Sequence, residues 1–134
     1  MINFPAWVTT MKIDKLIKKR VMLHDGLETR FFNQHVELIC PRCQKPIEPD
    51  LYQSGDFARL PEHIQAAVAV RIKAITFNPE AYTRYSAPEG SLLCSAHNCE
   101  DGQGKTLVIF SYKEQQPARY IATLYALLVV SEDE

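Results

Sequence analysis

The chain has 134 residues, of which 46% are apolar and 23% are charged, and this is the composition of an ordinary globular domain. Its net charge of −1 excludes the strong global field that draws a protein to nucleic acid or to an anionic membrane surface. The N-terminal residues lack the apolar core of a secretory signal, and the longest apolar run is about half of the ~20 residues that a membrane span needs. We therefore expect one cytoplasmic domain over residues 1–134, with no membrane partner.

The N-terminal part of the chain is predicted to contain a basic helix. In the segment KIDKLIKKR, residues Ile13, Leu16 and Ile17 recur at helical spacing, and lysines occupy the opposite face. The turn residues at 24–26 would end this helix, so residues 1–34 are predicted to form an N-terminal helical arm. The segment carries one acidic residue and five basic ones, which are Lys12, Lys15, Lys18, Lys19 and Arg20.

The middle of the chain alternates predicted strands with one predicted helix. The stretch HVELIC at 35–40 alternates apolar and polar residues, which indicates a strand that ends in a turn at Pro41. Pro61 suits the first position of a helix, and apolar residues continue at helical spacing until the stop at Asn78-Pro79. The segments SLLC at 91–94 and TLVIFSY at 106–112 are predicted strands.

The last apolar segment, residues 118–130, fits either a helix or the return strand of a hairpin. Its stripe at Ile121, Leu124, Tyr125 and Leu128 favours the helix. The predicted fold class is therefore α+β, with a small three-stranded antiparallel sheet and two to three helices.

The four cysteines fall into two closely spaced pairs. Cys40 and Cys43 form a C-x2-C pair, and Cys94 and Cys99 form a C-x4-C pair. Both spacings are typical of paired ligands of structural zinc, and cytoplasmic proteins rarely carry structural disulfides. We predict one structural Zn²⁺ bound by all four thiolates. His97 is the alternative fourth ligand, because Cys94-x2-His97 is also a ligand spacing.

Each cysteine pair follows or interrupts a predicted strand, at VELIC and at SLLC. Two knuckles at strand ends resemble the general layout of the zinc-ribbon class, over residues 35–45 and 90–112. The resemblance implies a small zinc-stabilised domain. The insert at 44–93, with its predicted helix, is longer than a minimal ribbon carries.

Two enzymatic interpretations of the first pair are weaker. A C-x2-C redox motif normally opens a helix, whereas the prolines in QKPIEPD after Cys43 cannot continue one. The His35-Val36-Glu37 stretch matches the H-x-E of zinc deaminases. On one strand, however, His35 and Cys40 would face opposite sides of the sheet. Redox and zinc hydrolase or deaminase chemistry are thus kept only as alternatives.

A zinc site with four protein ligands leaves no open position for water or substrate. We therefore predict a non-enzymatic, zinc-stabilised protein-binding module of the accessory, inhibitor or toxin-neutralising type. Arg42, at the exposed tip of the first knuckle, is the predicted partner contact. The alternative is a nucleic-acid-binding zinc protein that uses Arg42 and the basic segment 12–20.

Overall fold

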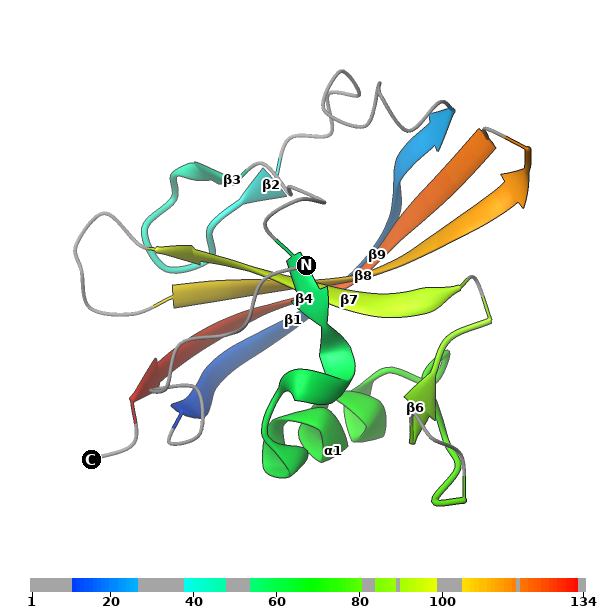
Figure 1. The fold of residues 1–134 in the computed structure, drawn as a ribbon. Helices are drawn as coiled ribbons and strands as arrows, with labels where there is room; N and C mark the ends of the chain where they lie inside the picture. The colour runs from blue at the N-terminus through cyan, green and yellow to red at the C-terminus, as the bar shows by residue number, and fades with distance from the viewer. Residues whose placement is uncertain are drawn as a thin grey trace.

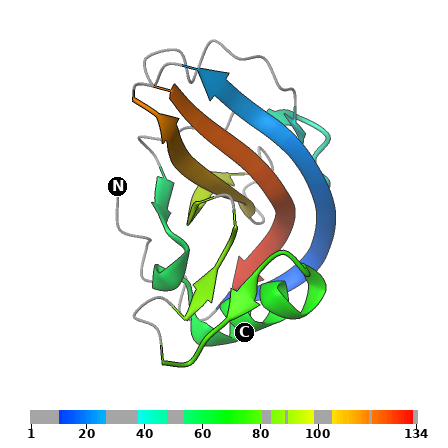
Figure 2. The same ribbon diagram turned by 90° about the vertical axis from the view of Figure 1, so that its right-hand side faces the viewer.

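A five-stranded antiparallel sheet dominates the computed structural model, which describes residues 11–26, 38–47, 54–80, 84–88, 90–98, 105–117 and 119–132. The strand order in this sheet is β1-β9-β8-β7-β4 (Figure 1). The strands are β1 (Met11–Gly26), β4 (Ser54–Asp56), β7 (Ser91–Asn98), β8 (Lys105–Gln116) and β9 (Arg119–Glu132). The sheet is strongly curved, as the turned view shows (Figure 2).

Shorter elements lie on the two sides of this sheet. The hairpin of β2 (Leu38–Ile39) and β3 (Pro46–Ile47) lies on one side, and the helix α1 (Glu62–Arg71) lies on the other (Figure 1). A 3-10 turn at Phe57–Arg59 precedes α1, and the small hairpin of β5 (Thr76–Phe77) and β6 (Tyr85–Ser86) follows it. No described helix has the length and apolar content needed to cross a membrane.

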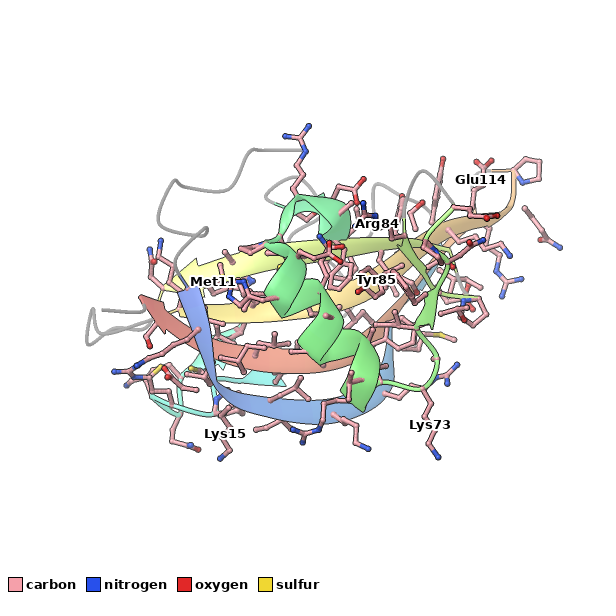
Figure 3. All side chains as sticks on the ribbon, turned by 90° about the horizontal axis from the view of Figure 1, so that it is seen from below. Met11, Lys15, Lys73, Arg84, Tyr85 and Glu114 are labelled. Carbon is pink, nitrogen blue, oxygen red and sulfur yellow. The ribbon has the colours of Figure 1, made fainter. Side chains whose placement is uncertain are left out.

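The helix α1 begins after Pro61, which has no backbone N–H to lose at this position. It lies across the strands in the view from below (Figure 3) and buries Ile64 and Val68 against the sheet. The His63 Nε2 atom lies 2.7 Å from the Met11 carbonyl oxygen and so ties α1 to the start of β1. The apolar cluster on this side includes Met11, Phe57, Ile64, Val68, Leu92, Cys94, Ile109 and Leu128.

A second apolar cluster lies on the side of the β2–β3 hairpin. Leu38 and Ile47, which are opposite each other in the hairpin, are both buried there. The cluster includes Leu23, Leu38, Cys40, Ile47, Leu93, Val108, Phe110 and Leu124. Because successive residues of a strand point to opposite faces, Leu93 and Cys94 of β7 belong to different clusters. The sheet therefore separates two cores, one under α1 and one under the hairpin.

The predicted fold class was wrong, because the structure is mostly β and its described residues contain one α-helix. The sheet has five strands rather than three, and the zinc-ribbon-like layout is not what organises it. Residues 12–20, predicted as a basic helix, belong to β1. In the segment 118–130 the favoured helix was wrong, because residues 119–130 belong to β9, which pairs with β8 as the alternative return strand. The predicted helix after Pro61 exists, but it ends at Arg71, before Asn78-Pro79.

The three predicted strands are confirmed where the structure describes them. Leu38 and Ile39 of the HVELIC stretch form β2, while residues 35–37 lie outside the described residues. The SLLC stretch begins β7, and the TLVIFSY stretch lies within β8. The whole of β7 pairs with residues 105–112, the first part of β8.

Candidate metal centre

The β2–β3 hairpin holds Cys40 and Cys43 in one tight turn. The Cys40 N–H donates to the Lys45 carbonyl oxygen at 2.8 Å, and the Gln44 N–H donates to the Cys40 carbonyl oxygen at 2.9 Å. Gln44 has a φ angle of 62°, in the left-handed region that single residues adopt in tight turns. These bonds place both thiols on the same short turn, as a zinc knuckle requires.

The surroundings of the Cys40 thiol favour its thiolate form. Burial opposes ionisation, since the side chain is only 3% exposed. Hydrogen bonds from the Thr106 hydroxyl, from the backbone N–H groups of Cys43 and Arg42, and from the Cys43 thiol outweigh this cost. The result is a pKa lowered from 9.0 to about 7 for Cys40. The thiolate, and not the thiol, is the form of a cysteine that binds metal ions.

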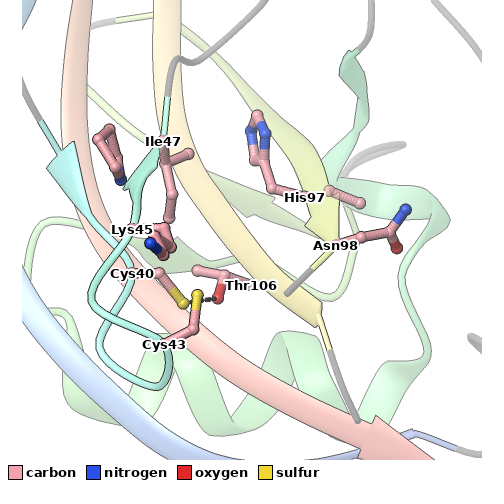
Figure 4. A pocket seen from close by; sticks show the side chains of 9 residues that line it. Cys40, Cys43, Lys45, Ile47, His97, Asn98 and Thr106 are labelled. Carbon is pink, nitrogen blue, oxygen red and sulfur yellow. Dashed lines mark hydrogen bonds between the residues drawn. The ribbon is translucent and has the colours of Figure 1, made fainter. Parts of the chain in front are cut away.

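A cavity of about 360 Å³ joins this turn to the end of β7 (Figure 4). Cys40, Cys43, Lys45, His97 and Thr106 are among its lining residues. Thr106 of β8 is directly opposite His97 of β7 in the sheet register, and its hydroxyl oxygen lies 3.1 Å from the Cys40 sulfur. Thr106 thus lies between the knuckle and the histidine.

The imidazole of His97 is turned away from the two sulfurs (Figure 4). Its Nε2 atom lies 2.9 Å from the hydroxyl oxygen of Ser95. Within the described parts of the chain, no group of three or more His, Cys, Asp or Glu side chains is close enough to hold a metal ion. A bond from His97 to a metal at the knuckle therefore requires its side chain to rotate away from Ser95.

Cys94 is not brought together with the knuckle. It is fully buried in the cluster on the α1 side of the sheet, whereas Cys40 lies in the cluster on the hairpin side. Burial raises the pKa of the Cys94 thiol, which keeps it protonated at neutral pH. Cys99, the other predicted ligand of this pair, lies outside the described residues. The four-cysteine ligand set thus stays a prediction.

The predicted partner-binding residues lie on two separate elements. Arg42 is exposed at the tip of the hairpin, next to Ile39, which is 39% exposed. The five basic residues of segment 12–20 are all exposed on β1, which is an edge strand of the sheet. They are Lys12, Lys15, Lys18, Lys19 and Arg20. Lysines on an edge strand also prevent pairing with other chains, which is a structural role that needs no ligand.

Thr106 is a site residue that the sequence analysis missed. Nothing in TLVIFSY distinguishes it from any other polar residue at the start of a strand. Only the register that places it opposite His97 shows its role. The residues His35 and Glu37, considered for deaminase chemistry, lie outside the described residues.

Comparison of the chain with protein-family models, with curated proteins and with solved structures finds no match.

Proposed function

We propose that the protein is a non-enzymatic binding module with a structural Zn²⁺ bound at the β2–β3 hairpin. The observation that carries this proposal is the turn at residues 40–43, where backbone N–H groups and Thr106 stabilise the thiolate of Cys40. Cys43 supplies a second thiolate from the same turn. A thiolate pair on a hairpin turn is a usual half of a structural zinc site.

His97 is the proposed third ligand, and Cys99, which lies outside the described residues, is the proposed fourth, so that protein ligands close the site. It lines the same cavity as the two thiols, and its neighbour Thr106 already contacts Cys40. Rotation about its side-chain bonds would exchange the bond to Ser95 for a bond to the metal. A metal here would link the short hairpin to β7, two elements that are far apart in the sequence. Its binding energy would then stabilise the fold on the hairpin side.

A redox role for the same pair is less well supported by the geometry. The thiol with the lowered pKa, Cys40, is the buried one of the two, whereas a redox nucleophile needs access to its substrate. The chain after Cys43 forms the β3 strand of a hairpin, not the helix that follows a C-x2-C redox motif.

The role of the metal is tested by thermal unfolding with and without a zinc chelator. We expect the chelator to lower the melting temperature of the wild-type protein by at least about 10 °C, because several kcal/mol of binding energy are lost. His97→Ala should weaken zinc binding and reduce the effect of the chelator. Ser91→Ala, exposed at the other end of β7, is the control and should behave as the wild type. An unchanged melting temperature of the wild type would contradict a structural metal.

The proposed partner is a protein with an acidic surface, which would contact the tip of the hairpin. This knuckle tip, defined as Ile39, Arg42 and Lys45, combines an exposed apolar side chain with two exposed cations at a hydrogen-bonded turn. Such a combination suits a small interface with an apolar centre and a charged rim.

The partner proposal is tested by affinity capture from cells of the native host. We expect one protein to be enriched stoichiometrically with the wild type and to be lost with Arg42→Glu. Lys12→Gln, which changes a cation on the remote strand β1, should retain it. Capture of the same proteins by all three forms would argue against the knuckle tip.

Nucleic-acid binding through β1 and Arg42 remains the alternative proposal. It predicts that a labelled oligonucleotide binds with an affinity that falls steeply as the salt concentration rises. Charge-reversal at Lys12 and Lys15 would then weaken binding more than Arg71→Gln on α1.

A further inference from the structure

A second cavity, of about 280 Å³, lies where β1, β9 and the C-terminal end of α1 meet. None of its lining residues is acidic, and five of them are cationic. The cations, which together define the basic pocket, are Lys18, Lys19, Arg20, Arg71 and Lys73. They come from segments more than fifty positions apart in the chain, so the fold and not the local sequence gathers them.

Two adjacent β-bulges shape this pocket. In the pairing of β1 with β9, Lys18 is opposite Ala126 and Val21 is opposite Leu124. The two residues Lys19 and Arg20 of β1 are therefore opposite the single residue Tyr125 of β9. In the pairing of β8 with β9, Ile109 is opposite Ala126 and Phe110 is opposite Leu124, which leaves Tyr125 as the extra residue. Bulges redirect side chains and are frequent beside binding sites.

Tyr125 is among the residues that line the pocket. It is 2% exposed, and its hydroxyl group is buried without a hydrogen-bond partner among the described residues. The guanidinium carbon of Arg20 lies 5.6 Å from the centre of its ring. A buried hydroxyl without a partner is costly, and each case in a folded protein calls for an explanation.

Four of the five cations that line the pocket have no ion pair with another described residue. Among the described residues, none of Lys18, Lys19, Arg71 and Lys73 takes part in an ion pair. The C-terminal dipole of α1 accounts for Arg71 and Lys73, and protection of the sheet edge accounts for the lysines of β1. Neither effect explains why the two groups converge on one cavity beside the buried Tyr125 side chain.

We propose that the basic pocket binds the phosphate group of a small anionic ligand. The surrounding cations donate hydrogen bonds to the phosphate oxygens and neutralise their charge. The Tyr125 hydroxyl, which is buried in this structure, becomes a further donor when its side chain shifts toward the ligand. The volume is slightly below that of sites for whole drug-sized ligands, which favours one phosphate-bearing group over an entire nucleotide.

The same observations disfavour nucleic acid as the ligand of this pocket. Single-stranded nucleic acid stacks its bases on exposed aromatic rings, whereas Tyr125 is buried beneath Arg20. Lys12 and Lys15, on the same strand, are not part of the lining, so the cations form a local cluster and not a track.

Isothermal titration calorimetry with inorganic phosphate and with pyrophosphate tests this proposal. We expect the wild-type protein to bind at least one of them with a Kd below about 1 mM. Lys73→Gln and Tyr125→Phe should each weaken binding by about tenfold, because each removes one donor to the phosphate. Lys12→Gln, outside the pocket, is the matched control and should bind as the wild type does.

Two results would overturn the proposal. They are no binding of either anion at millimolar concentration, and an equal loss of binding for Lys12→Gln and Lys73→Gln. Circular dichroism confirms the fold of each variant. Because Lys73 is exposed, Lys73→Gln is expected to fold. Its phosphate affinity therefore tests the proposal even if Tyr125→Phe does not fold.

Discussion

Thr106 shows how one side chain can set the state of a neighbouring cysteine. Its side chain is 1% exposed, and its hydroxyl oxygen is 3.1 Å from the Cys40 sulfur. When Cys40 is ionised, the thiolate can only accept, so the Thr106 hydroxyl must donate. This bond favours the thiolate and counteracts the cost of burial.

Replacing Thr106 by valine should therefore move the titration of Cys40 in the metal-free protein to higher pH. Valine has nearly the same shape but no hydroxyl. The wild type should show a thiolate transition near pH 7 in its ultraviolet absorbance, and Thr106→Val should show it later. Thr76→Val, exposed on β5, is the control. Identical titration curves for Thr106→Val and the wild type would contradict the assigned hydrogen bond.

The lowered pKa of Cys40 also links its ionisation to folding. A thiol with a folded-state pKa of about 7 and an ordinary value of 9.0 stabilises the folded state fully only above pH 9.0. Its contribution is lost as the pH falls from 9.0 through 7. The metal-free wild type should therefore gain more stability over this interval than metal-free Thr106→Val, as measured by urea denaturation at a series of pH values. Equal gains would argue against the coupling.

Gln44 is held in a conformation that glycine would adopt at less cost. Its φ of 62° is in the left-handed region, and its side chain donates only a 3.3 Å bond to the Pro41 carbonyl oxygen. Gln44→Gly should raise the free energy of unfolding by up to about 1 kcal/mol. Gln44→Val should lower it by about 1–2 kcal/mol, because a β-branched residue fits this region poorly. A valine variant as stable as the glycine variant in urea denaturation would contradict this account.

At this scale the sequence predicts one half of the candidate site. The C-x2-C spacing and the following prolines indicate a tight turn, and the turn exists. The second half depends on which face of β7 each residue occupies. Spacing alone cannot show this, because Cys94 and His97 are an odd number of residues apart and so point to opposite faces of a regular strand.

At the scale of elements, β-bulges explain why β1 resembles a helix in the sequence. Met11, Ile13 and Leu16 all pack on the α1 side, although Leu16 is three positions after Ile13. The register shift between Ile13 and Lys15 inserts the extra residue. A strand with such shifts loses its two-residue period and acquires spacings of three, which are typical of a helix.

The strand β9 was misread for a different reason. Residues 122–130 are all buried, because β9 lies near the middle of a sheet with a core on each face. A strand covered on both faces shows no alternation of apolar and polar residues. Its sequence therefore resembles a buried helix, and only its pairing with β1 and β8 distinguishes the two.

Gly90 fixes the entry of the chain into β7. Its φ is +122°, and an added Cβ would lie 2.6 Å from the Tyr112 carbonyl oxygen and from the Lys113 Cβ. Gly90→Ala should lower the free energy of unfolding by at least about 2 kcal/mol, because the backbones of β7 and β8 would have to separate. The neighbouring exposed substitution Ser91→Ala should stay within about 0.5 kcal/mol of the wild type. Chemical denaturation measures both, and equal stability of the two variants would contradict the close approach.

For the whole molecule, the separation of the two cores by one sheet has the largest consequence. The core under α1 includes Ile64, Val68 and Cys94, and it needs no metal to cover its side of the sheet. The other core is covered by a hairpin of two-residue strands, which is too short to be stable by itself. A metal bound by Cys40 and Cys43 would stabilise the β2–β3 hairpin and so the core that it covers. Cys94, on the other side of the sheet, would not take part.

Native mass spectrometry of the purified protein tests this account most directly, by counting the zinc ions bound to the wild type, to Cys43→Ser and to Cys94→Ala. The account predicts one zinc ion in the wild type and in Cys94→Ala, and none in Cys43→Ser. A wild-type protein without zinc, or a loss in Cys94→Ala equal to that in Cys43→Ser, would contradict it.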